Sequence, residues 1–186
     1  MCGIVGYTGA RQAAPLLLEG LKRLEYRGYD SAGLALVDQG RIEVHKAAGK
    51  IAALEKTLGA SLPGGRTGIA HTRWATHGVP NTVNAHPHTD CGGMLALVHN
   101  GIIENGDVLR AALVKRGHVF RSETDTEVLS HLIEELHGTG RSLVEAVAGA
   151  LRQVEGTYGI AVISAILRAA SLDSWMAIHS TQPTAQ

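Results

Sequence analysis

The chain has 186 residues, of which 45% are hydrophobic and 18% are charged; these values suit one ordinary globular domain and exclude a disordered chain. Its 17 Lys and Arg residues balance 17 Asp and Glu residues, which argues against a nucleic-acid coat or a binder of anionic membranes. Two cysteines cannot form a disulfide scaffold, and no apolar run approaches the ~18 residues of a membrane-spanning helix. We therefore expect a cytoplasmic protein whose partners include neither nucleic acid nor membrane.

Short strand patterns alternate with helical patterns along the chain. Apolar runs predict strands at 2–7, 32–37, 41–47, 67–73, 94–99 and 159–164. Apolar residues at helical spacing predict helices at 16–24, 50–58, 107–116, 126–137 and 142–154. We expect Thr124 and Glu127 to form a capping box at the start of the fourth helix. A long polar stretch at 75–93 is typical of a lid or a binding loop. Hairpins mixed with paired helices favour an α+β fold with antiparallel sheets covered by helices.

The most informative residue is Cys2, because removal of Met1 would make it the N-terminus of the mature chain. It would then carry a free α-amine with a reference pKa of ~7.7–8.0, which can activate the thiol as a nucleophile through a water. Position alone also allows an accidental cysteine at the second codon. The neighbouring Gly3 and Gly6 favour a nucleophile, because they let other backbone approach this strand. We interpret Cys91, in a polar turn, as a bystander.

Three polar positions lie where partners of a nucleophile could stand. Asn100 and Gly101 follow a buried strand, where they could form a two-donor oxyanion hole or only a common Asn-Gly turn. Arg73 ends another buried strand and could hold a carboxylate through two parallel hydrogen bonds, or form a surface salt bridge. Asp125 could bind a substrate ammonium or only complement the dipole of the helix that it precedes.

The ten histidines suggest a metal site at first sight. However, the chain shows neither a helical His pair at i, i+4 with an intervening Glu nor a CxxC motif. The proline between His86 and His88 should direct their two imidazoles to opposite sides. The glycine motifs that bind nucleotide phosphates or dinucleotides are also absent. We therefore expect neither a metal nor a cofactor.

Six segments together resemble a known family. They are MCGIVGY at 1–7, LEYRGYDSAGLA at 24–35, GIAHTRWATHG at 68–78, NAHPH at 84–88, VHNGIIEN at 98–105 and SETDTEV at 122–128. Each is a weak motif alone. In this order and at this spacing they resemble the N-terminal glutaminase domain of class II glutamine amidotransferases, in particular the glucosamine-6-phosphate synthase family. The resemblance implies an N-terminal-nucleophile hydrolase fold, a four-layer αββα sandwich of two antiparallel sheets between helix layers.

The resemblance also implies the catalytic roles. Cys2 would be the nucleophile that attacks the side-chain amide of L-glutamine. Asn100 and Gly101 would form the oxyanion hole for the resulting tetrahedral intermediate. Arg27 and Gly28 match a segment that supports the nucleophile.

The substrate would be held by a second set of residues that the same resemblance implies. Arg73, Thr76 and His77 would bind the α-carboxylate of glutamine. Asp125 would bind the α-ammonium group, aided by the backbone of the glycine in the oxyanion hole. Trp74 resembles the residue that gates the passage of ammonia.

The resemblance covers residues 1–164, which we expect to form a glutaminase domain that lacks its last strands. We expect residues 165–186 to be a divergent tail and the sugar isomerase domain of the family to be absent. By resemblance, the released ammonia would aminate fructose 6-phosphate to glucosamine 6-phosphate in that missing domain, and the full-length relative would form a homodimer. Two other interpretations are an inactive glutaminase-like fragment or interaction module, and a metal-binding domain built on the histidines.

Overall fold

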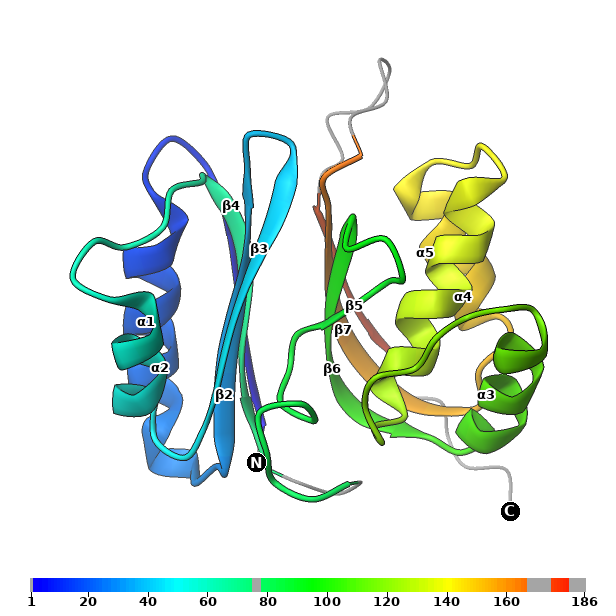
Figure 1. Ribbon diagram of the computed structural model, residues 1–186, viewed down its shortest axis with the longest axis horizontal. Helices are drawn as coiled ribbons and strands as arrows, with labels where there is room; N and C mark the ends of the chain where they lie inside the picture. The colour runs from blue at the N-terminus through cyan, green and yellow to red at the C-terminus, as the bar shows by residue number, and fades with distance from the viewer. Residues whose placement is uncertain (1, 75–77, 167–174, 181–186) are drawn as a thin grey trace.

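The molecule has four layers, in which two β-sheets stack face to face and helices cover both outer faces (Figure 1). The computed structural model describes residues 2–74, 78–166 and 175–180. Within these ranges each sheet contains four antiparallel strands. This arrangement confirms the predicted αββα fold class. Over the same residues, no helix has the length and apolar character needed to cross a membrane.

The first sheet has the strand order β1-β4-β2-β3. Its strands are β1 (Gly3–Thr8), β2 (Ser31–Asp38), β3 (Arg41–Ala48) and β4 (Thr67–Arg73). Its outer face is covered by α1 (Ala13–Leu24) and α2 (Ile51–Leu58), and the 3-10 helix η1 (Glu25–Arg27) follows α1. The hairpin between β2 and β3 turns at Gln39 and Gly40, whose φ angles of 47° and 73° suit a two-residue turn between twisted strands.

The second sheet has the strand order β5-β6-β7-β8. Its strands are β5 (His88–Thr89), β6 (Leu95–Ile103), β7 (Gly156–Ser164) and β8 (Trp175–Ser180). The helices on its outer face are α3 (Gly106–Lys115), α4 (Thr126–Gly138) and α5 (Leu143–Leu151).

Strand β8 lies in the segment that we expected to be a divergent tail. It pairs with β7 in antiparallel register, from Trp175 opposite Ile163 to Ser180 opposite Tyr158. The second sheet therefore extends beyond residue 164, whereas the expected domain bounds stay a prediction. The physical reason is that β7 has backbone N–H and C=O groups on this edge, and a further strand satisfies them.

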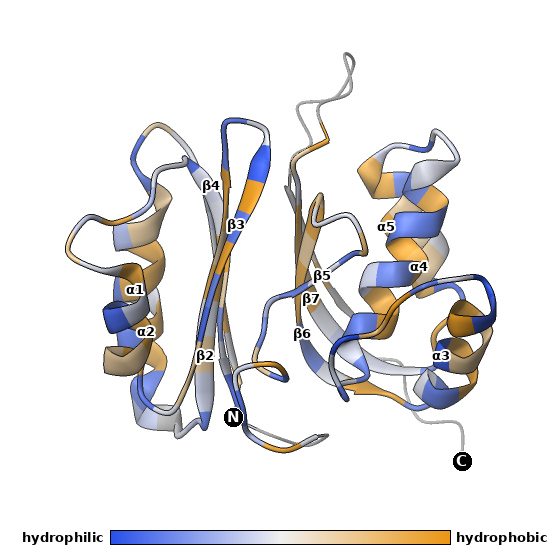
Figure 2. Cartoon of the chain, in the orientation of Figure 1, coloured by the Kyte–Doolittle hydropathy of each residue, from blue (hydrophilic) through white to orange (hydrophobic). Residues whose placement is uncertain are grey.

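Three apolar clusters join the layers, and hydrophobic stretches run through the strands of both sheets and the helices packed on them (Figure 2). Helix α1 buries Leu17 and Leu21 against the first sheet, and α4 buries Leu129 and Leu132 against the second. Each such leucine contributes roughly 1.5–3 kcal/mol when fully buried. The cluster between the sheets is made of Ala35, Ile69, Ala96, Val98, Ala161 and Ile163. These small and branched side chains allow the two sheets to approach closely.

The capping box predicted at Thr124 and Glu127 is wrong. Asp125 is the N-cap of α4, and its side chain makes no capping hydrogen bond. The Glu127 carboxylate instead accepts hydrogen bonds from the backbone N–H groups of Arg121 and Ser122, at 2.8 and 2.7 Å. These donors in the preceding loop compete successfully for the carboxylate, so Glu127 organises the loop rather than the first turn of α4.

Candidate active site

Cys2 follows the N-terminus, which is marked N at one end of the molecule, between the two sheets (Figure 1). Asn100, from the second sheet, contacts Cys2 there. Gly3 of β1 pairs with Thr72 of β4, which places Cys2 beside the end of β4. The Trp74 N–H donates to the Cys2 Sγ atom at 3.1 Å. From the second sheet, the Asn100 Nδ2 atom donates to the Cys2 carbonyl oxygen at 3.5 Å. The half-buried Cys2 residue thus has a side-chain amide donor at its backbone carbonyl.

The Asn100 amide is oriented by His71, a residue that sequence reasoning did not assign to the site. The His71 Nε2 atom lies 2.8 Å from Asn100 Oδ1. Burial lowers the pKa of His71 to about 4, so the ring is neutral at pH 7 and its Nε2–H donates to the amide oxygen. The amide nitrogen is thereby turned toward Cys2. The sequence contained a signal for including His71 in the site. His71 and Arg73 stand two residues apart and so share one face of β4.

Two of the predicted glycines occupy positions that a larger residue would disrupt. Gly101 has a φ of 138°, and a Cβ atom there would lie 2.0 Å from the Thr157 carbonyl oxygen. Gly28 has a φ of 72°, and a Cβ atom there would lie 2.8 Å from the Trp74 ring. Both positions therefore require glycine for conformation and for space. Trp74 itself is 54% exposed, with one part of its ring against Gly28.

Arg73 is buried, which removes the alternative of a surface salt bridge. Its Nη1 atom lies 4.0 Å from Asp30 Oδ1, and its Nη2 atom donates to the Gly78 carbonyl oxygen at 3.4 Å. The Asp30 N–H also donates to the Arg73 carbonyl oxygen at 2.8 Å. Asp30 was not predicted, although it directly precedes β2, the neighbour of β4. The Arg73 guanidinium is thus held at the end of β4. The next residue is Trp74, whose backbone N–H contacts the Cys2 thiol.

Asp125 lies beside the strand that carries Asn100. Its Oδ2 atom accepts a hydrogen bond from the Ile103 N–H at 2.8 Å, which ties the start of α4 to β6. The carboxylate also lines an open pocket of about 350 Å³, together with Glu123 and Arg110. Asp125 therefore lies at a solvent-accessible hollow, and its predicted role in binding an ammonium stays a prediction.

Three predicted residues have side chains outside the described part of the chain. Thr76 and His77 lie between the described ranges. Arg27 ends η1, but its side chain is not described. The structure brings together Cys2 and Asn100, whereas the roles expected for Arg27, Thr76 and His77 stay predictions.

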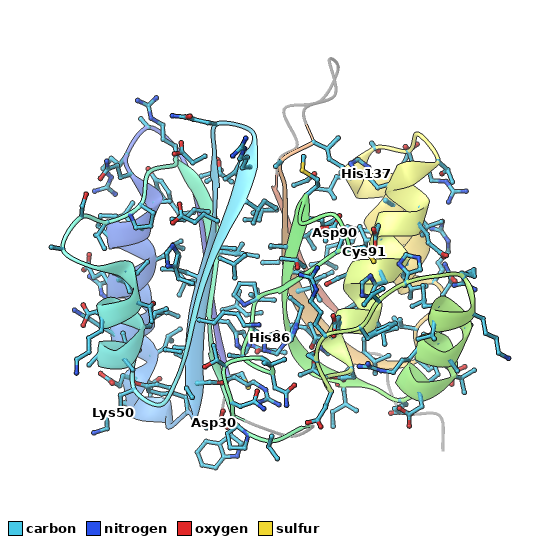
Figure 3. All side chains as sticks on the ribbon, viewed as in Figure 1. Asp30, Lys50, His86, Asp90, Cys91 and His137 are labelled. Atoms are coloured by element: carbon cyan, nitrogen blue, oxygen red, sulfur yellow. The ribbon has the colours of Figure 1, made fainter. Side chains whose placement is uncertain are left out.

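The expectation for His86 and His88 is wrong. Their ring centroids lie only 4.8 Å apart, and the peptide bond that joins His86 to Pro87 is cis. Both rings are buried, with His86 between the sheets (Figure 3), and burial lowers the pKa of each well below its ordinary value. They bond to the hydroxyl groups of Thr126 and Thr124, at 2.8 and 3.1 Å. Part of the predicted lid is therefore a buried segment that positions the start of α4.

The comparisons with known proteins agree with this geometry. Residues 71–171 match the model of a family described as a glutamine amidotransferase domain. The chain is 57% identical over 166 residues to a glutamine–fructose-6-phosphate aminotransferase [isomerizing] of Pyrococcus horikoshii, covering 89% of this chain and 28% of the relative. It is 58% identical over 164 residues to the protein of the same name from Symbiobacterium thermophilum, with 88% and 26% covered. The chain thus spans 26–28% of the length of these curated relatives.

A solved structure shows the same fold. It is the glutamine phosphoribosylpyrophosphate amidotransferase from B. subtilis complexed with ADP and GMP, with a TM-score of 0.74 and 30% sequence identity. The match covers 87% of this chain and 35% of that one. Because the family model spans more than half of the sequence, the chain belongs to the glutamine amidotransferase domain family.

Proposed function

We propose that this chain is a glutaminase, which uses Cys2 to release ammonia from the side-chain amide of L-glutamine. The observation that carries the proposal is the contact between the Cys2 residue and the Asn100 amide, which is turned toward it by His71. A thiol with a nearby preorganised hydrogen-bond donor suits acyl transfer. Membership of the glutamine amidotransferase domain family supports glutamine as the acyl donor.

The proposed reaction proceeds through a thioester. After removal of Met1, the α-amine of Cys2 takes the thiol proton, through a water, while Sγ attacks the amide carbon. The oxyanion receives hydrogen bonds from Asn100 Nδ2 and the Gly101 N–H. The carbon–nitrogen bond then breaks, and ammonia leaves with the proton that the amine held. Water adds to the γ-glutamyl thioester and releases glutamate and the free thiol.

The same proposal assigns glutamine binding to charged groups around the thiol. The buried Arg73 guanidinium would pair with the α-carboxylate, together with Thr76 and His77. Asp125, which faces the open pocket, would pair with the α-ammonium group. Trp74 would gate the passage of ammonia, since its backbone contacts the thiol while its ring is exposed.

We further propose that the ammonia aminates fructose 6-phosphate to give glucosamine 6-phosphate. The support is the printed name of the curated relatives, glutamine–fructose-6-phosphate aminotransferase [isomerizing]. This step would take place in a sugar-binding domain outside the present chain. Arg27 and Gly28 would support the nucleophile, and the complete protein would act in the cytoplasm as a homodimer.

Labelling with an electrophilic glutamine analogue, a diazo ketone, tests the glutaminase proposal. Intact-mass measurement first establishes that Met1 is absent. We expect one adduct per chain, which peptide mapping places on Cys2, and none in C2A. The variant C91S is the matched control and should be labelled like the unmodified chain. A folded, Met-free chain whose Cys2 stays unlabelled would instead support an inactive glutaminase-like fragment.

A further inference from the structure

A second cluster of reactive side chains lies on the far side of the second sheet from Cys2. Cys91 stands in the turn between β5 and β6, beside α4 (Figure 3). His131 and Glu134 lie one turn apart on α4, and His118 lies in the segment that follows α3. One ligand atom from each of these four residues lies within 4.8 Å of the others. Cys91, which we had interpreted as a bystander, therefore has three chemically matched neighbours.

The separations within the cluster suit a tetrahedron. The two Nδ1 atoms of His118 and His131 are 3.2 Å apart, and the Glu134 Oε2 atom lies 3.0 Å from each. The Cys91 Sγ atom lies 3.7 Å from the first Nδ1 atom and 3.6 Å from the second. Tetrahedral zinc, with bonds of ~2.0–2.3 Å, separates its ligand atoms by roughly 3.3–3.6 Å. The two distances from sulfur match this geometry to within about 0.1 Å, and the three among nitrogen and oxygen are about 0.1–0.3 Å short of it, so a small outward movement of these side chains would admit one ion.

Both imidazoles also have a carboxylate on their outer side. The His118 Nε2 atom lies 3.2 Å from Glu135 Oε1, and the His131 Nε2 atom lies 3.7 Å from Glu127 Oε1, beyond hydrogen-bond distance. When a metal ion neutralises Glu134, which lies beside both Nδ1 atoms, the carboxylate beside Nε2 favours the proton on that nitrogen. The Nδ1 lone pairs of both rings then point into the cluster. This second observation is independent of the distances among the four inner atoms.

With that tautomer and an ionised Cys91 thiol, four electron-rich atoms would face one another, and a cation would offset their repulsion beyond the one hydrogen bond that Glu134 Oε2 accepts from the Cys91 N–H, at 3.2 Å. Ionised Cys91 and Glu134 would contribute two negative charges, and two neutral imidazoles none. A divalent ion balances this set, and tetrahedral sulfur and nitrogen ligands are typical of zinc. We propose that Cys91, His118, His131 and Glu134 bind one Zn²⁺ ion, with the Cys91 thiol losing its proton to solvent on binding.

The ion would have a structural role. Four protein ligands complete a tetrahedron and leave no open position for a substrate or a water. The ion would join the turn between β5 and β6, the segment after α3, and α4. Asp125 is the N-cap of the same helix, so the ion would stabilise an element that also reaches the candidate active site. The proposed zinc site does not depend on the glutaminase proposal.

Metal titration of the full chain tests this inference. After chelation and dialysis, we expect one Zn²⁺ per chain by elemental analysis. Co²⁺ should give the absorption bands of a tetrahedral site together with a thiolate-to-cobalt charge-transfer band. The variants C91S and H118N should weaken zinc binding by about tenfold or more, the scale seen for altered metal sites. The charge-transfer band should vanish in C91S. The variant C2S is the matched thiol control and should keep both the band and the stoichiometry.

Two results would overturn the inference. One is a folded chain that binds less than one zinc ion in two molecules, or binds it equally well in C91S and H118N. The other is a cobalt spectrum of the unmodified chain that is octahedral and lacks the sulfur band. Because this spectrum needs no variant, the test still decides if C91S or H118N fails to fold. Either result would mean that a shared proton, rather than a metal, offsets the repulsion between the two imidazoles.

Discussion

His71 fixes the direction of the Asn100 amide through the 2.8 Å hydrogen bond between Nε2 and Oδ1. An amide that could rotate would present its oxygen to the developing oxyanion for part of the time, and an oxygen there is repulsive. Because burial holds the pKa of His71 at about 4, the ring keeps this donor role across the physiological range. His71 is thus a positioning residue, which acts through Asn100.

We expect the variant H71L to lower kcat for glutamine hydrolysis by about two- to tenfold, with a smaller effect on KM. The reason is the loss of one orienting hydrogen bond, which is worth ~0.5–1.5 kcal/mol. The variant N100A, which removes the donor itself, should lose more, ~10²–10³ in kcat. The measurement is steady-state release of glutamate, after circular dichroism confirms the fold. H71Q, which offers an amide N–H, should recover part of the loss. An H71L protein with unchanged kcat would contradict the role.

At the scale of elements, strands and helices were predictable where one face or both faces are buried. The run at 67–73 coincides with β4, because its continuous apolar and buried character is typical of a central strand. Strand β5 has two residues and β8 has no distinctive pattern, so both depend on pairing with neighbours. The capping box forms at Ser142 and Glu145 instead, where the carboxylate accepts a hydrogen bond from the Ser142 N–H at 2.9 Å.

The candidate site was predictable only in part, for a related reason. Cys2, Asn100 and Arg73 stand in motifs that are local in the sequence. The contact of His71 with Asn100 joins residues 29 positions apart, and Cys91 lies 40 positions from His131. Such pairs are set by strand register and by helix packing on a sheet, which no short motif records. The positions that the prediction omitted are therefore those defined by tertiary contact.

The connection between η1 and β2 supports the active site through Gly28. We expect G28A to reduce the free energy of unfolding by ~1–2 kcal/mol from its positive φ alone, plus the cost of displacing the Trp74 ring. G40A is a matched control, because Gly40 has nearly the same φ, 73°, but nothing lies within 4 Å of the added Cβ. Urea denaturation should show a larger loss for G28A than for G40A. Equal losses would mean that the Trp74 contact contributes nothing.

At the scale of the whole molecule, the two sheets enclose histidines that stay neutral. Burial lowers the pKa of His71 to about 4 and lowers those of His86 and His88 well below the ordinary value. These rings bind protons in the unfolded chain near pH 6.5 but not in the folded one. The unfolded state therefore takes up more protons as the pH falls below neutrality.

It follows that the free energy of unfolding should fall steadily between pH 7 and pH 4. His71 alone would account for a loss on the order of 3 kcal/mol over this window. Burial lowers the pKa of His131, but the nearby Glu127 and Glu134 carboxylates raise it overall in the metal-free chain, so this ring opposes the trend there. Urea denaturation at a series of pH values measures the slope. A free energy that is constant or rises on acidification would contradict the buried, neutral state of these histidines.

The central claim is that Cys2, as the first residue of the processed chain, cleaves glutamine. Its most direct test is the rate of glutamate release from L-glutamine by the purified, Met-free chain, compared with the rate for C2A. We predict catalytic turnover in the unmodified chain, with equal amounts of ammonia and glutamate, and none above background in C2A. Equal release by C2A, or no release by a folded and Met-free chain, would contradict the claim.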